Sequence, residues 1–177
     1  MSLETLREAL PDYAKDIKLN LSTLARETGL SDQQKWGCFL ACAYAIGQPD
    51  VIAALNAETA DRLEDAAKTA AKAAAAIMGM NNVYYRATHL IQNPDYAQLP
   101  AKLRMNVIGN PGVDKVDFEL WSLAVSAING CGMCLDSHEA VLIKAGLGKD
   151  KIQTGLRIAA VVNAASRVIV AERAASV

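Results

Sequence analysis

The chain has 177 residues, of which 52% are hydrophobic and 21% charged, so residues 1–177 can bury a core as a single domain. The net charge is −1 and lysine and arginine do not cluster, which argues against a nucleic-acid partner. There is no run of about 18 apolar residues to span a membrane, and the charged N-terminus does not resemble a signal peptide. We therefore expect a cytoplasmic protein in which thiols are kept reduced.

Residues 1–92 have the apolar periodicity of helices, with glycine and proline between the apolar runs. Ser31 and Gln34 match a capping box, which predicts a helix that begins after Ser31 and ends before Gly47. An alanine-rich run later in this half predicts a long central helix that neighbours can approach closely. The helices predicted here are 2–10, 11–26, 32–46, 50–57 after Pro49, and one from Thr59 or Asp61 to residue 91.

The second half follows an irregular stretch, residues 93–112, which contains three prolines and indicates a linker. Either Asp114 or Asp117 is suited to cap the next helix, and Gly146 to end the helix with the second cysteine pair. β-branched alternation is scarce throughout, so we predict an all-α fold. The helices predicted here are one from the aspartate cap to residue 128, then 131–144 and 150–173.

Two tryptophans suggest that the halves, about residues 1–92 and 113–177, repeat one helical unit. Trp36 and Trp121 each lie early in an amphipathic helix that ends at a glycine-containing break. In the register that the tryptophans set, residues 46–49 stand where the second half has residues 131–134. The first half would then be scaffold, and the chemistry would belong to the second.

The motif that organises the chain is Cys131-Gly-Met-Cys134, followed by His138. In a helix that opens at Cys131 these three side chains share one stripe. Cysteines at i and i+3 can close a disulfide, because their Cα atoms are then roughly 5–6 Å apart, or stay open as a dithiol. The helix N-terminus favours thiolates, and His138 could exchange a proton with Cys134. The pattern predicts a redox-active dithiol; half of a zinc site and an inert core pair are the alternatives.

Other candidate residues precede the motif. Glu119, one helix earlier, could orient His138 and take up its proton, or could simply be a glutamate favoured by the helix dipole. Cys38 and Cys42 lie four residues apart among aromatic and apolar residues, which favours buried core positions over a share in a four-cysteine zinc site. We expect no bound metal or cofactor.

Beyond the cysteine motif, stretches along nearly the whole chain resemble the alkyl hydroperoxidase D family of the carboxymuconolactone decarboxylase-like superfamily. The resemblance is carried by Glu119, Trp121 and residues 10–20, 77–86, 103–112 and 127–138. It implies a duplicated all-α fold that assembles as a homotrimer.

The resemblance also implies an antioxidant, lipoyl-dependent alkyl hydroperoxide reductase that reduces organic hydroperoxides at the cysteine pair. It implies that the enzyme reduces the disulfide of a partner peroxiredoxin, alkyl hydroperoxide reductase C. The electrons would come from dihydrolipoyl groups of a lipoylated 2-oxoacid dehydrogenase component. The alternative is a redox-sensing or partner-binding scaffold whose dithiol switches without peroxide turnover.

The resemblance assigns a role to each motif residue. Cys134 would form the sulfenic acid, while Cys131, the more exposed thiol, would supply the proton, close the disulfide and form the mixed disulfide with the partner. Glu119 and His138 would relay protons, through a water. The helix dipole by itself favours Cys131 as the more readily ionised thiol, but we follow the family because His138 lies beside Cys134. Well-known members have histidine at the position of Met133, so any role of that histidine in tuning the thiols or docking a partner is absent here.

Overall fold

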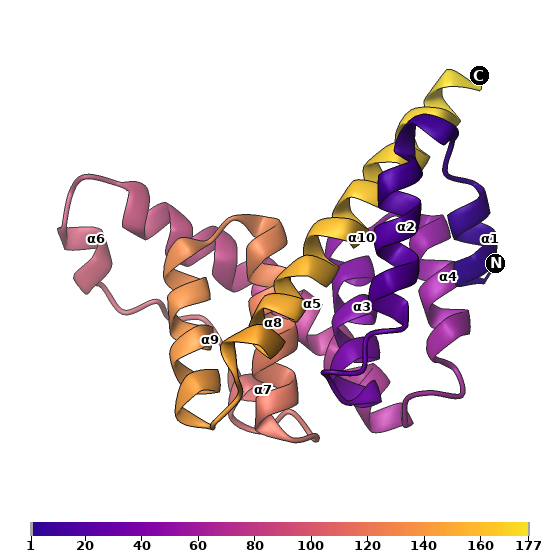
Figure 1. Cartoon of the computed structure of the whole chain (residues 1–177). Coiled ribbons are helices and arrows are strands. Elements are labelled where there is room, and N and C mark those ends of the chain that lie inside the picture. Colours follow the sequence, from indigo (N-terminus) through magenta and orange to yellow (C-terminus); the bar gives the residue numbers. More distant parts are fainter. Residues whose placement is uncertain (1, 177) are drawn as a thin grey trace.

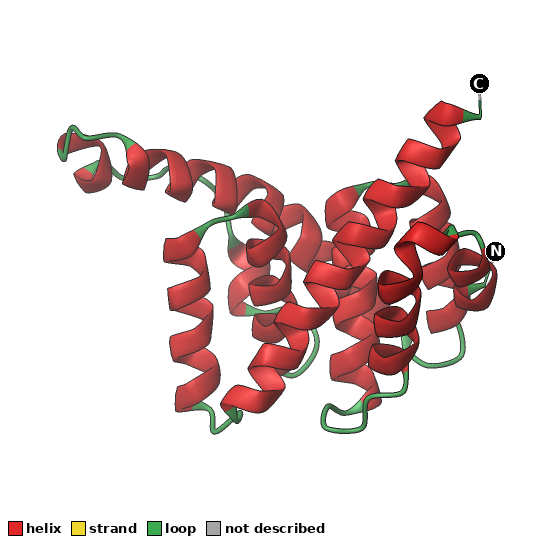
Figure 2. Cartoon of the chain, turned by 45° about the horizontal axis from the view of Figure 1, so that its top comes forward, coloured by secondary structure: helices red, strands yellow, loops and turns green. Residues whose placement is uncertain are grey.

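The computed structural model describes residues 2–176, and every regular element within them is helical (Figure 2). The prediction of an all-α fold is therefore confirmed. The elements in chain order are α1 (Leu3–Glu8), the 3-10 helix η1 (Asp12–Ala14), α2 (Lys15–Ala25), α3 (Asp32–Ile46), α4 (Pro49–Thr59), α5 (Asp65–Leu90), α6 (Asp95–Gln98), α7 (Asn106–Gly109), α8 (Lys115–Asn129), α9 (Gly132–Lys144) and α10 (Lys149–Ala175).

Four long helices, α3, α5, α8 and α10, form the centre of the molecule. Helix α3 packs against α5, α8 and α10, and α8 packs against α5, α9 and α10. Helices α1, α2 and α4 lie together on one side of this centre, whereas α9 lies on the other side, against α8 and α5 (Figure 1). The two halves of the chain therefore share one core, and α5 reaches from the first half to the helix that carries the cysteine motif.

The crossing of α3 and α8 depends on a glycine. A Cβ atom at Gly37 would lie 2.1 Å from Cε2 of Trp121, so only glycine leaves room for the indole on this face of α3. Trp121 is fully buried, and its Nε1 donates a hydrogen bond to the backbone oxygen of Gln34 at 3.1 Å. This contact fixes α8, the helix that precedes the motif, against the centre of the core.

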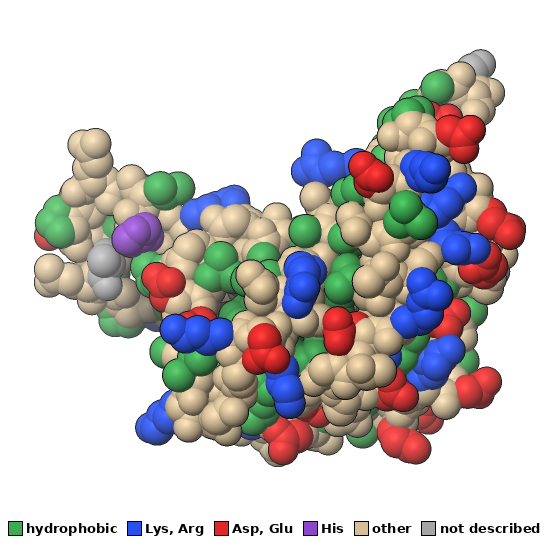
Figure 3. Space-filling model, in the orientation of Figure 1, with side chains coloured by type: hydrophobic (Ala, Val, Ile, Leu, Met, Phe, Trp, Pro, Cys, Tyr) green, Lys and Arg blue, Asp and Glu red, His purple; other side chains and the backbone are tan. Residues whose placement is uncertain are grey.

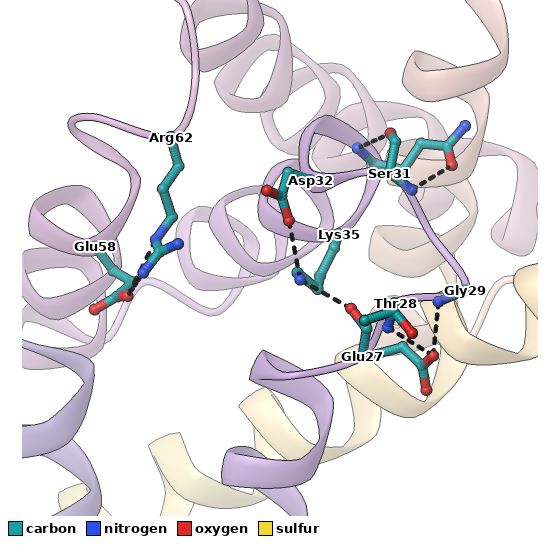
Figure 4. Close-up of polar contacts among 9 residues, drawn as sticks. Glu27, Thr28, Gly29, Ser31, Asp32, Lys35, Glu58 and Arg62 are labelled. Atoms are coloured by element: carbon teal, nitrogen blue, oxygen red, sulfur yellow. Dashed lines mark hydrogen bonds and ion pairs between the residues drawn. The ribbon is translucent and has the colours of Figure 1, made fainter.

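The start of α3 is held by local hydrogen bonds (Figure 4). The predicted capping box is confirmed: the Ser31 hydroxyl accepts from the Gln34 N–H at 3.1 Å, and the Gln34 side chain accepts from the Ser31 N–H at 3.2 Å. Just before it, the Glu27 carboxylate accepts the N–H groups of Gly29 and Thr28, which lowers the pKa of Glu27. These bonds define the turn between α2 and α3.

Several predicted boundaries are wrong. The long helix α5 begins at Asp65, because Thr59 belongs to α4, where its hydroxyl donates to the Leu55 backbone oxygen at 2.7 Å. Of the two candidate caps of α8, Asp114 accepts the Val116 N–H at 2.7 Å, whereas Asp117 lies inside the helix. The expected second helix begins with a 3-10 turn, and the expected linker contains the short helices α6 and α7.

The C-terminal part of α5 projects from the body together with α6, and these residues, 83–99, form an arm (Figures 1 and 2). The arm carries five exposed large apolar side chains: Val83, Leu90, Ile91, Tyr96 and Leu99. In the view of Figure 3, positive and negative side chains are scattered over the body, and hydrophobic side chains are visible both between these charges and on the arm.

Helix α10 is long and apolar enough, by length and composition alone, to cross a membrane. Half of its most apolar window is buried, and the helix packs against α8, α3 and α2. This is the setting of a core helix, and burial in the fold accounts for its composition.

Candidate active site

The motif cysteines lie at the tight turn between α8 and α9. Helix α8 ends at Gly130, whose φ of +67° lies in the left-handed region that favours glycine. Cys131 is the N-cap residue of α9, its N–H donating to the Ser126 oxygen at 3.1 Å, and Cys134 lies in the first turn. The two sulfurs form a disulfide, with the Cα atoms 5.3 Å apart. The prediction that this spacing can close a disulfide is confirmed.

His138 and Glu119 form a buried pair next to the motif. Nδ1 of His138 lies 2.6 Å from Oε2 of Glu119, which reaches it from α8. The exposed fractions of the two residues are 8% and 4%, so Glu119 faces the contact between α8 and α9 rather than solvent. On the other side of the ring, Nε2 lies 3.2 Å from Sδ of Met78. The expected approach of the carboxylate to the imidazole is confirmed, and this contact fixes the orientation of the ring.

A pocket of about 330 Å³ opens beside this pair. Cys134, His138 and Glu119 line it together with Met133. The other lining residues are mainly apolar and come from three segments of the chain, α5, residues 105–108 and α9: Met78, Asn81, Tyr85, Met105, Ile108, Ser137 and Val141. The pocket therefore joins one sulfur of the disulfide and the Glu119–His138 pair to a largely apolar wall, and small-molecule sites commonly combine a few polar groups with such a wall.

The two cysteines differ in their access to this pocket: Cys134 lines it, although Cys131 was expected to be the more exposed. Cys131 is 0% exposed and does not line the pocket, whereas Cys134 is 7% exposed and does. The expectation that Cys131 is the more exposed of the two is therefore wrong for the disulfide form. The reason is its place at the N-cap, where the turn that follows Gly130 folds Cys131 back toward Ser126.

Helix α5 contributes to the site although it lies in the half expected to be scaffold. Asn82 donates to the Ser126 hydroxyl and accepts from Asn129, both at 2.9 Å, and Arg86 donates to the Asn129 backbone oxygen. These bonds hold the end of α8 directly before the cysteine turn. Sequence reasoning missed these contacts, and the one available signal was a pair of adjacent asparagines in an alanine-rich helix.

Cys38 and Cys42 lie on α3 with exposed fractions of 0%, as free thiols. Burial raises the pKa of both thiols. Within residues 2–176, no three histidine, cysteine or acidic side chains come together in a way that could hold a metal ion. The alternative of a four-cysteine zinc site is therefore unsupported, and the two thiols behave as core residues, as predicted.

Comparison with known proteins places these features in a family. The model of the carboxymuconolactone decarboxylase family matches residues 94–176, which include Glu119, both motif cysteines and His138. The chain is 66% identical to an alkyl hydroperoxide reductase AhpD of Hyphomonas neptunium over 98% of its own length and 97% of the relative's. It is 65% identical to an alkyl hydroperoxide reductase AhpD of Maricaulis maris, over 97% of this chain and 99% of the relative.

A third relative, an alkyl hydroperoxide reductase AhpD of a Bradyrhizobium species, is 59% identical over 100% of this chain and 96% of the relative's length. Identity at this level along whole chains extends the match well beyond the segment that the family model covers. The chain therefore belongs to the AhpD group of the carboxymuconolactone decarboxylase family.

Proposed function

We propose that this protein is an antioxidant alkyl hydroperoxide reductase that works through a dithiol/disulfide cycle of Cys131 and Cys134. One observation carries the proposal: the Cys134 side chain lines an apolar pocket beside the Glu119–His138 pair while bonded to a second cysteine. The names of the relatives, which are similar to this chain along its whole length, support the same activity.

The proposed cycle begins from the reduced dithiol. The Glu119–His138 pair takes the proton of Cys134, and the resulting thiolate attacks the terminal oxygen of the hydroperoxide. A sulfur–oxygen bond forms, the oxygen–oxygen bond breaks, and the leaving alkoxide becomes an alcohol. We assign its proton to His138 rather than to Cys131, because Cys131 does not line the pocket. The thiol of Cys131 then attacks the sulfenic acid, which gives the disulfide and releases water. Sulfur is oxidised and the peroxide reduced, without a bound metal or cofactor.

The pocket favours an organic hydroperoxide over hydrogen peroxide as the substrate. Three methionines, Met78, Met105 and Met133, contribute flexible side chains to its wall, and Ile108 and Val141 add apolar surface. Transfer of an alkyl group from water to this wall is favourable, whereas hydrogen peroxide has no apolar part to bury.

For the second half of the cycle we propose disulfide exchange with protein partners. Electrons would come from dihydrolipoyl groups of a lipoylated 2-oxoacid dehydrogenase component, and the reduced dithiol would in turn reduce the peroxiredoxin alkyl hydroperoxide reductase C. The mixed disulfide with that partner is assigned to Cys131. Because Cys131 is buried in the disulfide form, this assignment requires its thiol to become accessible after reduction.

We further propose that the protein acts in the cytoplasm as a homotrimer. The exposed apolar side chains of the arm support self-association, because burial of this apolar surface against another copy is favourable. Light scattering of the purified protein tests this directly: a mass three times that of the chain is expected, and a monomer would contradict it.

The test of function is consumption of cumene hydroperoxide with dihydrolipoamide as the electron donor, with and without the peroxiredoxin. We expect multiple turnovers of peroxide without the peroxiredoxin and faster consumption with it. A protein that forms its disulfide once with peroxide but does not turn over would instead be a redox-sensing scaffold. If the peroxiredoxin is not reduced while peroxide is consumed, the reductase part of the proposal is wrong.

A further inference from the structure

The pocket wall contains one buried polar side chain that no part of the mechanism uses. Asn81 lies on α5, its exposed fraction is 5%, and it lines the pocket with Cys134 and His138. Its Oδ1 atom is buried and has no hydrogen-bond partner within residues 2–176. A buried amide oxygen without a partner is unfavourable, so such a group calls for a ligand or a bound water.

The neighbouring residue shows that an asparagine in this helix can be satisfied by the protein. Asn82 is 0% exposed, yet it uses both ends of its amide, with Ser126 and Asn129 as partners at 2.9 Å. The two side chains differ in what they face: Asn82 faces the end of α8, whereas Asn81 faces the pocket. The unpaired Oδ1 atom therefore belongs to a residue of the pocket wall.

The other buried polar groups of this wall are already engaged. Glu119 and His138 bind each other, and the sulfur of Cys134 is the reacting atom. An amide offers one acceptor and two N–H donors, and a hydroperoxide group offers one O–H donor and two acceptor oxygens. The hydrogen-bonding groups of Asn81 thus complement those of the substrate at the place where the substrate must lie.

Building on the proposed function, we propose that Asn81 binds the hydroperoxide group and orients its oxygen–oxygen bond toward Cys134. When the thiolate forms the sulfur–oxygen bond and the oxygen–oxygen bond breaks, negative charge develops on the inner oxygen. An amide N–H donated to that oxygen stabilises the charge until the proton arrives from His138. Asn81 moves no proton itself, and its amide is unchanged at the end of the step.

The test compares Asn81→Leu with Asn82→Leu in two separate half-reactions. The first is oxidation of the pre-reduced protein by cumene hydroperoxide, and the second is reduction of its disulfide by dithiothreitol. Asn81→Leu should slow the first by about tenfold or more, the loss expected for one hydrogen bond to a charge-bearing oxygen, and leave the second unchanged. Its thermal midpoint should stay the same or rise, because leucine replaces an unpaired buried amide with a side chain of similar size.

Asn82→Leu is the matched structural control. It leaves Ser126 and Asn129 without partners, so its thermal midpoint should fall and both half-reactions should change together. If Asn81→Leu oxidises at the wild-type rate, or if it behaves like Asn82→Leu, the assignment of Asn81 is wrong while the proposed function stands. If the wild-type protein itself fails to react with the peroxide, the proposed function and this assignment are both overturned.

Discussion

The breaks after α3 and after α8 have the same form but different chemistry. Each helix ends at a glycine with positive φ, Gly47 at +80° and Gly130 at +67°, and the next residue caps the following helix. In the first break that residue is Gln48, whose side chain accepts the N–H of Val51 at 2.8 Å. In the second it is Cys131, which makes no capping bond through its side chain and is joined to Cys134 by a disulfide.

Alignment of the two glycines changes the register suggested by the tryptophans by two residues. Gln48 then corresponds to Cys131 and Val51 to Cys134. In the register of the tryptophans, residues 46–49 corresponded to residues 131–134. In the register of the glycines, Glu119 and His138 correspond to Trp36 and Leu55, both of which are buried apolar residues. The duplication itself stays a proposal, supported by the matching order of helices α3–α4–α5 and α8–α9–α10.

The difference teaches where reactivity enters this fold. A capping position places its side chain over the first turn of a helix, with unpaired N–H groups nearby. Gln48 accepts one of these N–H groups, whereas the side chain of Cys131 accepts none and leaves them available to the thiolate that the proposed cycle forms at Cys134. Substitutions that affect one half of the molecule and spare the other therefore test the comparison.

The largest difference is expected between the two cysteine pairs. Cys131→Ser and Cys134→Ser should each reduce peroxide turnover to the background rate, because the cycle needs one sulfur to attack and the other to resolve. Cys38→Ala and Cys42→Ala should retain turnover per folded molecule, since both thiols lie in the core of α3. The measurement is steady-state consumption of cumene hydroperoxide with dihydrolipoamide. Full activity in either serine variant would contradict the proposed cycle.

The next largest effect is expected at Glu119 and His138, which correspond to two apolar residues in the first half. Glu119→Gln and His138→Gln should each slow oxidation by peroxide by about 10²–10⁴-fold, the usual contribution of a positioned acid or base. They should also change the pH dependence of this rate. Asp136→Asn, an exposed carboxylate on the same helix as His138, is the control and should have no effect. An unaltered pH–rate profile in both glutamine variants would refute the relay.

The contact that joins the two halves should be the most sensitive to added volume. Gly37→Ala would drive a methyl group into the indole of Trp121, so we expect a loss of about 3 kcal/mol in the free energy of unfolding. Gly79→Ala on α5 meets no atom within 4 Å and should instead stabilise the helix, by about 0.5–1 kcal/mol. Urea denaturation of both variants gives the comparison. Equal effects would mean that α3 and α8 are not closely packed here.

Local signals in the sequence predicted much of this arrangement. The capping box at Ser31, the glycine breaks and the cysteine spacing depend on neighbours within a few residues, and these are visible without a fold. The start of α5 could not be predicted, because Thr59 and Asp61 both look like caps, whereas α4 extends to Thr59 and α5 begins only at Asp65. The burial of Cys131 and the role of Asn81 depend on packing between distant segments, which spacing along the chain does not encode.

The buried pair Cys38 and Cys42 also predicts a pH effect on stability. Burial raises the pKa of both thiols, so they stay protonated in the folded protein while the unfolded chain releases protons above about pH 8.5. Their contribution is therefore complete below that pH and is lost above it, at up to about 1.4 kcal/mol per pH unit for each thiol. Urea unfolding of the disulfide form across this range should show the slope. The Cys38→Ala/Cys42→Ala variant should lose it, and an equal slope in that variant would contradict the assignment.

The smallest expected effect separates the two tryptophans that first suggested the repeat. Nε1 of Trp121 donates to Gln34, whereas Nε1 of Trp36 is buried with no hydrogen-bond partner in residues 2–176. Phenylalanine removes this N–H in either case, but only Trp121→Phe breaks a hydrogen bond. Trp121→Phe should therefore cost about 1 kcal/mol more in the free energy of unfolding than Trp36→Phe. Equal losses would mean that the two indoles are held by packing alone, and that the halves do not differ in this bond.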